Sequence, residues 1–339
     1  MKYTVVVDQF EEREIRPPEL YDQYVSLILD EMPRLLGDPS GWRSCDCPAC
    51  GSGDQSAAFE KNGFAYRRCH SCQSLFISPR PGQDALAAFR RRSRGERFWL
   101  DRIVSATAES RSRHVSSPRI EWIIDNALSA KVRPLVHLHV GPVYDLIPEI
   151  LAQRGIFDRV LAACAGGGAA GMHEGDPDTI ARADLSSLGT LPDNLALVSL
   201  FETLEGEHDP LATLTSLRAK LSPGGRILIA TVNAGGFEIQ MLRERARSVG
   251  LPSHLNLLSV RGVSTLLERS GFRVLELSTP GQLDAELVVK ACRQDPTLAL
   301  PAFLDGIVRS EDPSIVRHFQ EFLQLARRSS HMRLVAEAA

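Results

Sequence analysis

A strand, a tight turn and a helix are indicated near the middle of the chain, and this unit constrains the fold more than any other stretch. In RPLVHLHVGP (133–142), apolar residues alternate with two histidines, which is the two-residue period of a β-strand. Glycine and proline then turn the chain. The apolar residues that follow recur at helical spacing, and Gly155 is predicted to end this helix. This order predicts the opening of a Rossmann-like, doubly wound α/β sheet.

Further apolar runs continue this sheet toward the C-terminus. RVLAAC (159–164), LALVSLF (195–201) and RILIATV (226–232) contain few polar residues, as expected for parallel strands that are buried on both faces. Helices are predicted after Asp209, which precedes a proline, and from Ser259 onward. FRVLELST (272–279) and AELVVKAC (285–292) have no helix between them, so we expect an antiparallel pair at the sheet edge.

Two C-x2-C pairs lie in the N-terminal third of the chain, separated by eighteen residues. Their members are Cys47, Cys50, Cys69 and Cys72. This spacing is typical of a four-thiolate zinc site, which leaves no open position for water and is therefore structural. Cys45 is a spare thiol, and His70 is the weaker competitor for a ligand place. A redox dithiol is disfavoured because both pairs are present at zinc-ribbon spacing.

Composition limits the classes of partner and the location of the protein, and the order of the motifs divides the chain into segments. A formal net charge of −3 over 339 residues gives no basic field to attract nucleic acid or an anionic membrane. No apolar run approaches the roughly 20 residues that span a bilayer, and the N-terminus does not resemble a secretory signal, so we expect a cytoplasmic protein. The predicted segments are an N-terminal helical arm (1–43), a zinc-ribbon segment (44–82), a helical linker (83–132), a Rossmann-like domain (133–293) and an amphipathic, helical C-terminal tail (294–339).

The helical arms are where we expect a protein partner or a second subunit to bind. Apolar residues recur at helical spacing between Leu20 and Leu36, and the alternative is that this face covers the chain's own core. A run of arginines follows in the linker, at Arg90, Arg91, Arg92, Arg94 and Arg97. It either grips phosphate or forms a solvated helix face, and the acidic total charge favours the second interpretation.

Three stretches resemble the class I S-adenosylmethionine-dependent methyltransferases that carry an N-terminal zinc-binding segment. They are CPACGSGD…FEKNGFAYRRCHSCQSLFISPRP, LFETLEGEHDPLATLTSLRAKLSPGGRILIATVN and HLNLLSVRGVSTLLERSGFRVLELSTPGQLD, and together they cover most of residues 45 to 290. The resemblance implies a Rossmann-like methyltransferase sheet, a structural zinc ion and a small-molecule substrate. It also places His254 beside the substrate pocket.

The cofactor contacts of that family are altered in this sequence. Members carry an acid and then G-x-G-x-G after the first strand, but here His139 stands at the acid, Gly141 is kept, and Val143 and Asp145 stand at the later glycines. Glycine is used there because the backbone must approach the ligand without a Cβ atom. The second strand ends at Cys164 without the carboxylate that binds the ribose hydroxyls. These changes predict a degenerate S-adenosylmethionine site.

Other polar residues allow more than one interpretation. His137 and His139 share one strand face and, with Cys164 or His173, form either a metal site or the filling of an emptied pocket. The glycine-rich loop at 166–176 either cradles phosphate or is a flexible loop, and Cys164 is either a reactive thiol or a small buried residue. If chemistry survives, His254 is the candidate general base, with Glu202 and Glu205 in the same pocket. The alternative is that His254 ties a loop to the sheet.

Three hypotheses follow for the whole protein. The first is a pseudo-methyltransferase that acts as a scaffold or partner subunit of a catalytic protein. The second is an active methyltransferase with altered cofactor binding and a small-molecule or sugar-like substrate. The third is a fold repurposed for another reaction in the remodelled pocket, because a fold by itself does not choose among these.

Overall fold

The central feature of the protein is a seven-stranded sheet in the order β10-β11-β8-β7-β4-β5-β6. The computed structural model describes residues 10–142, 144–164 and 180–339. The strands are β4 (Val136–Val140), β5 (Arg159–Cys164), β6 (Ile180–Asp184), β7 (Leu195–Phe201), β8 (Leu221–Val232), β10 (Phe272–Ser278) and β11 (His331–Ala338). The five from β4 to β8 are parallel to their neighbours, whereas β11 runs antiparallel to both β8 and β10. The Rossmann-like, doubly wound prediction is therefore confirmed.

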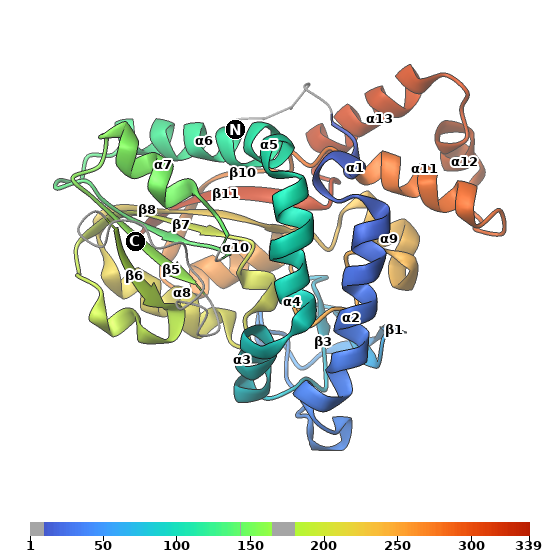
Figure 1. Ribbon diagram of the computed structural model, residues 1–339, viewed down its shortest axis with the longest axis horizontal. Coiled ribbons are helices and arrows are strands. Elements are labelled where there is room, and N and C mark those ends of the chain that lie inside the picture. The colour runs from blue at the N-terminus through green and yellow to red at the C-terminus, as the bar shows by residue number, and fades with distance from the viewer. Residues whose placement is uncertain (1–9, 143, 165–179) are drawn as a thin grey trace.

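Helices cover both faces of this sheet because its strands are apolar on both sides. α6 (Ser117–Leu128) and α7 (Ile147–Arg154) pack on one face, and α8 (Pro210–Lys220) and α10 (Val260–Arg269) on the other (Figure 1). The predicted cap at Asp209 is present, since its side chain accepts from Ala212 N at 3.0 Å. The helix predicted from Ser259 is capped by that serine, which accepts from Gly262 N at 2.8 Å. α7 ends as predicted at Gly155, whose φ of 63° is left-handed.

The cysteine-bearing segment builds a second sheet, in the order β1-β2-β3-β9. β1 (Gln55–Lys61), β2 (Phe64–Cys69) and β3 (Leu75–Ile77) come from the segment itself, but β9 (Asn256–Leu257) comes from the Rossmann-like domain. All three pairings are antiparallel. The segment is therefore joined to the larger domain by a shared sheet.

The N-terminal arm packs on the chain itself. α2 (Pro18–Leu36) buries one apolar face in a core with Phe64, Tyr66 and Leu257. The interpretation that this helix covers the chain's own core is therefore confirmed. The other elements before the large sheet are α1 (Glu12–Ile15), η1 (Pro39–Gly41), α3 (Gln83–Arg92), α4 (Arg94–Phe98), η2 (Trp99–Val104), α5 (Ala108–Arg111) and η3 (Ser112–Ser116). Short turns at η5 (Leu185–Thr190), η6 (Leu204–Gly206) and η7 (Arg243–Arg245), and helix α9 (Phe237–Leu242), complete the connections.

Two predictions about the C-terminal third are wrong. AELVVKAC is not a strand but part of α11 (Asp284–Gln294): its two adjacent valines resemble a strand, yet the buried positions recur at helical spacing. Glu286 and Lys290 form an ion pair one turn apart on that helix. The tail contains α12 (Ala302–Val308) and α13 (Pro313–Leu325) but ends in β11, which takes the place beside β10 that was predicted for residues 285–292. No described helix is long and apolar enough to cross a membrane.

Candidate functional site

Four thiols meet at one point of the cysteine-bearing segment. The ligand atoms of Cys47, Cys50, Cys69 and Cys72 all lie within 4.8 Å of one another. The sulfur atoms of Cys47 and Cys72 are 3.6 Å apart, and those of Cys50 and Cys69 are 3.5 Å apart. Four thiols at such distances fit a tetrahedral metal ion of the zinc class. Cys45 and His70 lie outside the cluster. Among the described residues, no other group of three or more potential metal ligands lies within such distances.

A cavity of about 760 Å³ lies at the carboxyl ends of the parallel strands. β4, β5, β7 and β8 contribute its floor, at the point where the chain order of the sheet reverses, which is where doubly wound sheets bind ligands. Helices α2, α3 and α4 contribute further lining residues. Five of the predicted site residues line it, namely Gly141, Cys164, Glu202, Glu205 and His254.

The bend after β4 is filled by side chains of the protein itself. His139 Nε2 lies 3.3 Å from the carboxylate of Asp145, and both side chains are buried. A Cβ atom added at Gly141 would lie 2.6 Å from His139 Nε2, so the histidine ring occupies the space that this glycine leaves. Asp145 also accepts from Ile147 N at 3.2 Å, as expected for a cap at the start of α7. His139 and Asp145 therefore lie against each other at the bend, although Nε2 of this histidine forms no hydrogen bond with the described residues.

Ser199 on β7 joins both histidines of β4. Its hydroxyl lies 3.0 Å from His137 Nε2 and 2.8 Å from His139 Nδ1. Burial and the neighbouring imidazole hold the pKa of His137 well below its usual range, so this ring is neutral. The two histidines do not join a metal cluster in the part of the chain that is described. His173, Val143 and the loop at 166–176 lie outside the described residues.

The pKa values of two glutamates at the carboxyl end of β7 are shifted in opposite directions. Burial raises the pKa of Glu202, but its ion pair with Arg119 of α6 outweighs this effect and holds the pKa at about 2. Burial raises the pKa of Glu205 to about 7, although its carboxylate accepts from the Thr231 hydroxyl at 2.7 Å. Glu202 also adopts a φ of 48°, a left-handed conformation that non-glycine residues rarely adopt. One carboxylate is thus fixed as an anion and the other titrates near neutrality.

His254 is held by the loop that precedes β9. Its Nδ1 atom lies 3.0 Å from the Ser253 hydroxyl, and its carbonyl oxygen accepts from the Tyr66 hydroxyl at 2.9 Å. Burial, together with Arg16, lowers the pKa of His254 to about 4, so the ring is neutral at pH 7 and only weakly basic. Its role as a general base remains a prediction.

Several lining residues were missed by the sequence reasoning. Trp99 and Tyr24 come from the N-terminal helices, where a helical apolar stripe alone indicated only packing. His331 opens β11, which the sequence reasoning placed in a helix, and burial with nearby Arg119 lowers its pKa to about 3. An isolated histidine in a polar stretch carries no local signal for this position.

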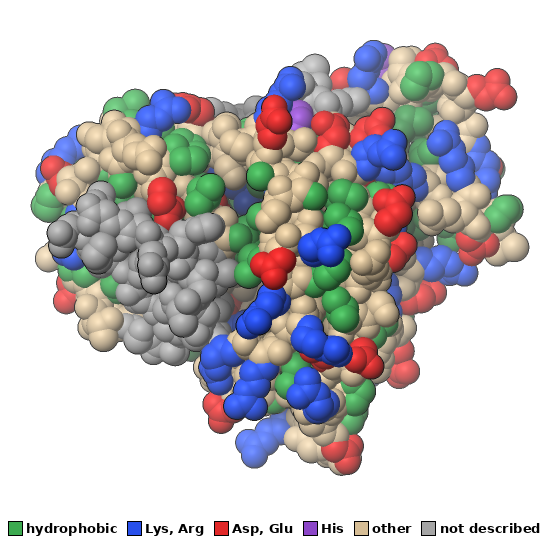
Figure 2. Space-filling model, viewed as in Figure 1, with side chains coloured by type: hydrophobic (Ala, Val, Ile, Leu, Met, Phe, Trp, Pro, Cys, Tyr) green, Lys and Arg blue, Asp and Glu red, His purple; other side chains and the backbone are tan. Residues whose placement is uncertain are grey.

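The arginine run is divided between internal pairs and solvent. Arg94 pairs with Asp30 and with the buried Glu31, and Arg90 pairs with Glu207. Arg91, Arg92 and Arg97 are exposed, and basic side chains gather over α3 and α4 in the space-filling view (Figure 2). The favoured interpretation of a solvated helix face fits these exposed members.

Comparison with known proteins identifies one domain. The family model described as a methyltransferase domain matches residues 135–277. No curated protein matches the chain. Among solved structures, a putative sarcosine dimethylglycine methyltransferase from Galdieria sulphuraria is 15% identical, with 67% of this chain and 88% of that chain covered and a TM-score of 0.40.

Two further solved structures show similarities of the same order. The plantazolicin methyltransferase BpumL in complex with SAH is 11% identical, covering 76% of this chain and 95% of that one, with a TM-score of 0.45. A complex of the Haloferax volcanii Trm112 methyltransferase activator with a putative methyltransferase is 16% identical, covering 68% and 95%, with a TM-score of 0.44.

Proposed function

We propose that the chain, whose residues 135–277 match the family model of a methyltransferase domain, is a pseudo-methyltransferase. In this proposal the protein keeps the fold, has lost the usual S-adenosylmethionine site, and acts as a scaffold or partner subunit of a catalytic protein.

The observation that carries the proposal is the closed bend after β4. The cofactor of this family needs open backbone there, but His139 fills the space beside Gly141 and lies against Asp145 and Ser199. Opening the bend would separate His139 Nδ1 from the buried Ser199 hydroxyl, at a cost of about 1–3 kcal/mol for each group left unsatisfied. This filled bend supports the proposal that the cofactor does not bind in its usual position.

A structural zinc ion is the second part of the proposal. Cys47, Cys50, Cys69 and Cys72 would hold it as thiolates, and the ion would supply cross-linking rather than catalysis because four thiolates complete its coordination. Ser74 supports the cluster by lying 3.3 Å from the Cys72 sulfur and accepting from Ser259 N at 3.0 Å. This contact joins the cysteine cluster to the N-terminal end of α10.

The partner role draws support from the C-terminal helices. Phe303 on α12 is 77% exposed, and Phe322 on α13 is 57% exposed. Ile315 and Leu325 on α13 are also exposed, at 42% and 49%, and apolar surface that gathers in one place marks sites where another protein binds. α2, by contrast, is already buried against its own chain, so the C-terminal helices are the better candidates among the helical arms.

Calorimetric titration of the zinc-loaded protein with S-adenosylmethionine and S-adenosylhomocysteine tests the proposal. We expect no heat of binding at millimolar ligand from a protein that is folded and contains zinc. The double variant His139→Asp with Asp145→Gly restores two family residues and is the matched comparison. Micromolar binding by the unaltered chain would refute the degenerate-site proposal.

A second candidate is an active methyltransferase with altered cofactor binding. The cavity favours it, because about 760 Å³ lies within the usual range for small-molecule sites and His254, Glu202 and Glu205 line it. The substrate would be a small or sugar-like molecule, and a repurposed reaction would use the same space. Transfer of a labelled methyl group to an acceptor mixture, lost in His254→Ala, would establish this candidate over the first.

A further inference from the structure

The N-terminal strap, residues 10–17, lies at the edge of the cavity, between two helices that are far apart in sequence (Figure 1). α1 lies within it and is placed between α5 and α11 (Figure 1). Ile15 and Arg16 of the strap line the cavity, together with Tyr21 from the first turns of α2. The strap is therefore part of the wall that separates the cavity from solvent.

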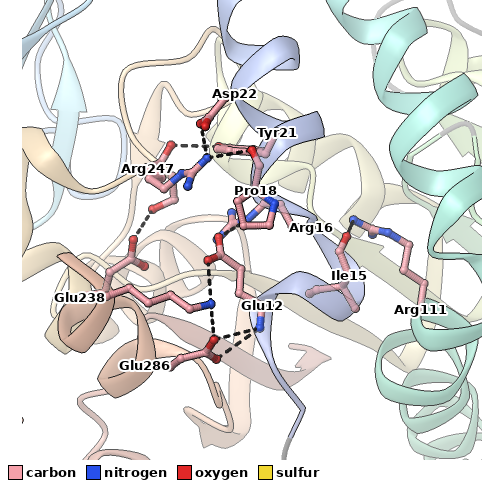
Figure 3. Close-up of polar contacts among 12 residues, drawn as sticks. Glu12, Ile15, Arg16, Pro18, Tyr21, Asp22, Arg111, Glu238, Arg247 and Glu286 are labelled. Atoms are coloured by element: carbon pink, nitrogen blue, oxygen red, sulfur yellow. Dashed lines mark hydrogen bonds and ion pairs between the residues drawn. The ribbon is translucent and has the colours of Figure 1, made fainter. Parts of the chain in front are cut away.

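On the side of α11, the strap is held by charges. The backbone amide of Glu12 donates to the two carboxylate oxygens of Glu286, at 3.2 and 3.3 Å (Figure 3). Lys290 Nζ lies 3.5 Å from the Glu12 carboxylate, whose side chain is only 2% exposed. Glu12 also accepts from Arg16 Nε at 2.9 Å, so its single carboxylate links the strap to α11 and to the cavity wall.

On the opposite side, the strap is held by the α5 region. Arg111 donates to the carbonyl oxygen of Ile15 at 2.8 Å (Figure 3). Its guanidinium also lies over the Trp99 ring, 5.1 Å from the centroid. The His114 ring stacks on Phe10 with centroids 4.8 Å apart, and its Nε2 lies 3.6 Å from the Glu14 carboxylate. These contacts are polar or aromatic.

The strap has little apolar anchoring. Of residues 10–17, all of which are described, Glu12 alone is buried. By contrast, the adjoining helix α2 places Tyr21, Tyr24 and Ile28 in the core. Charged groups released from such contacts are hydrated, so detaching the strap costs much less than unfolding α2. Pro17 and Pro18 mark the boundary between the two because proline limits the backbone there.

We propose that the N-terminal strap is a gate over the cavity, latched to α11 through Glu12 and to α5 through the Ile15 carbonyl, and that it opens to admit the ligand. Opening exposes Trp99 and the cavity floor while the core behind α2 stays intact. The proposal concerns access to the cavity and holds for whichever small molecule binds there.

Hydrogen exchange of the full-length, metal-loaded protein tests the gate. Glu12→Ala removes the carboxylate that contacts both Lys290 and Arg16. We expect amides of residues 10–17 to exchange about tenfold faster, as for the loss of a charge-assisted hydrogen bond, while amides of α2 keep their rates. Arg13→Ala is the matched control because Arg13 lies on the same turn, is exposed and forms no hydrogen bond or ion pair with the described residues; the exchange rates of the strap should not change in this variant.

Fluorescence of Trp99 gives an independent readout. In a protein with Trp42→Phe and Trp122→Phe, acrylamide should quench Trp99 more strongly after Glu12→Ala or the milder Lys290→Ala. The reporter for the remaining fold is Trp42, retained in a protein with Trp99→Phe and Trp122→Phe, and its quenching should not change. Unchanged exchange and Trp99 quenching in both variants, or an equal rise at Trp42 and in α2, would overturn the gate.

Discussion

Replacing Tyr66 by phenylalanine should separate the cysteine-bearing segment from the wall of the cavity. Tyr66 is on β2 and is 1% exposed. Its hydroxyl donates to the carbonyl oxygen of His254 at 2.9 Å and accepts from the amide of Gly250 at 3.0 Å. A single oxygen atom therefore joins β2 to two backbone groups of the loop that carries His254.

The expected loss follows from those two bonds. Phenylalanine keeps the ring and its packing against Phe59, so the change removes the hydroxyl alone. An amide and a carbonyl are then left without partners in a buried place, where each such group costs about 1–3 kcal/mol. Because the loop can relax by a small movement, we expect the free energy of unfolding to fall by about 2–3 kcal/mol.

Urea unfolding of the metal-loaded protein, followed by circular dichroism, measures this change. Ser71→Ala is the matched control: it removes a hydroxyl that bonds Ser52 at 3.0 Å in the same segment, but at an exposed position. Its effect should be within about 0.5 kcal/mol. A Tyr66→Phe protein as stable as the control, with an unchanged dependence on urea, would refute the idea that the segment supports the His254 loop.

Three further predictions concern the sheet, the titrating carboxylate and the metal. Ser199→Ala leaves His137 and His139 without their shared hydroxyl and should lower the free energy of unfolding by about 2 kcal/mol in urea; an unchanged midpoint would contradict the buried network. Glu205, with a folded pKa of about 7, binds a proton in the folded state that the unfolded chain releases above about pH 4.5, so its stabilising contribution is lost as pH rises from about 4.5 to 7. Glu205→Gln should therefore reduce the loss of stability between pH 5 and pH 8 by up to about 3 kcal/mol, and equal losses in both proteins would exclude this group as the source. Cys50→Ser should lower the bound zinc measured by atomic emission and the melting temperature together, whereas full zinc content would contradict the four-thiolate site.

The local pattern of the sequence was enough to predict most elements of the large domain. Strands that are apolar on both faces and helices with an acid or serine cap carry their signals within a few residues, so β7, β8, α8 and α10 lie where they were predicted. The cysteine cluster was equally accessible, because the spacing of two C-x2-C pairs limits which thiols can meet.

The edge of the sheet was decided by packing rather than by local preference. Val288 and Val289 favour a strand by propensity, yet α11 buries Ala285, Val288 and Cys292 as one helical face. The strand that pairs with β10 comes instead from the last nine residues of the chain. The sequence pattern near β10 does not predict pairing with a strand more than fifty residues away. Long-range pairing of this kind depends on which surfaces remain uncovered after the core has formed.

The site shows the same division. The sequence by itself determined that the family's acid and glycines after β4 are replaced, because identity and order are local facts. What the new residues do follows from the tertiary structure: His139 lies against Asp145 and Ser199, Arg119 fixes Glu202 as an anion, and Ile15 and Arg16 of the strap line the cavity. These contacts join elements that are far apart in the chain, and burial strengthens the electrostatic interactions between them. The sequence pattern of any one element therefore does not predict them.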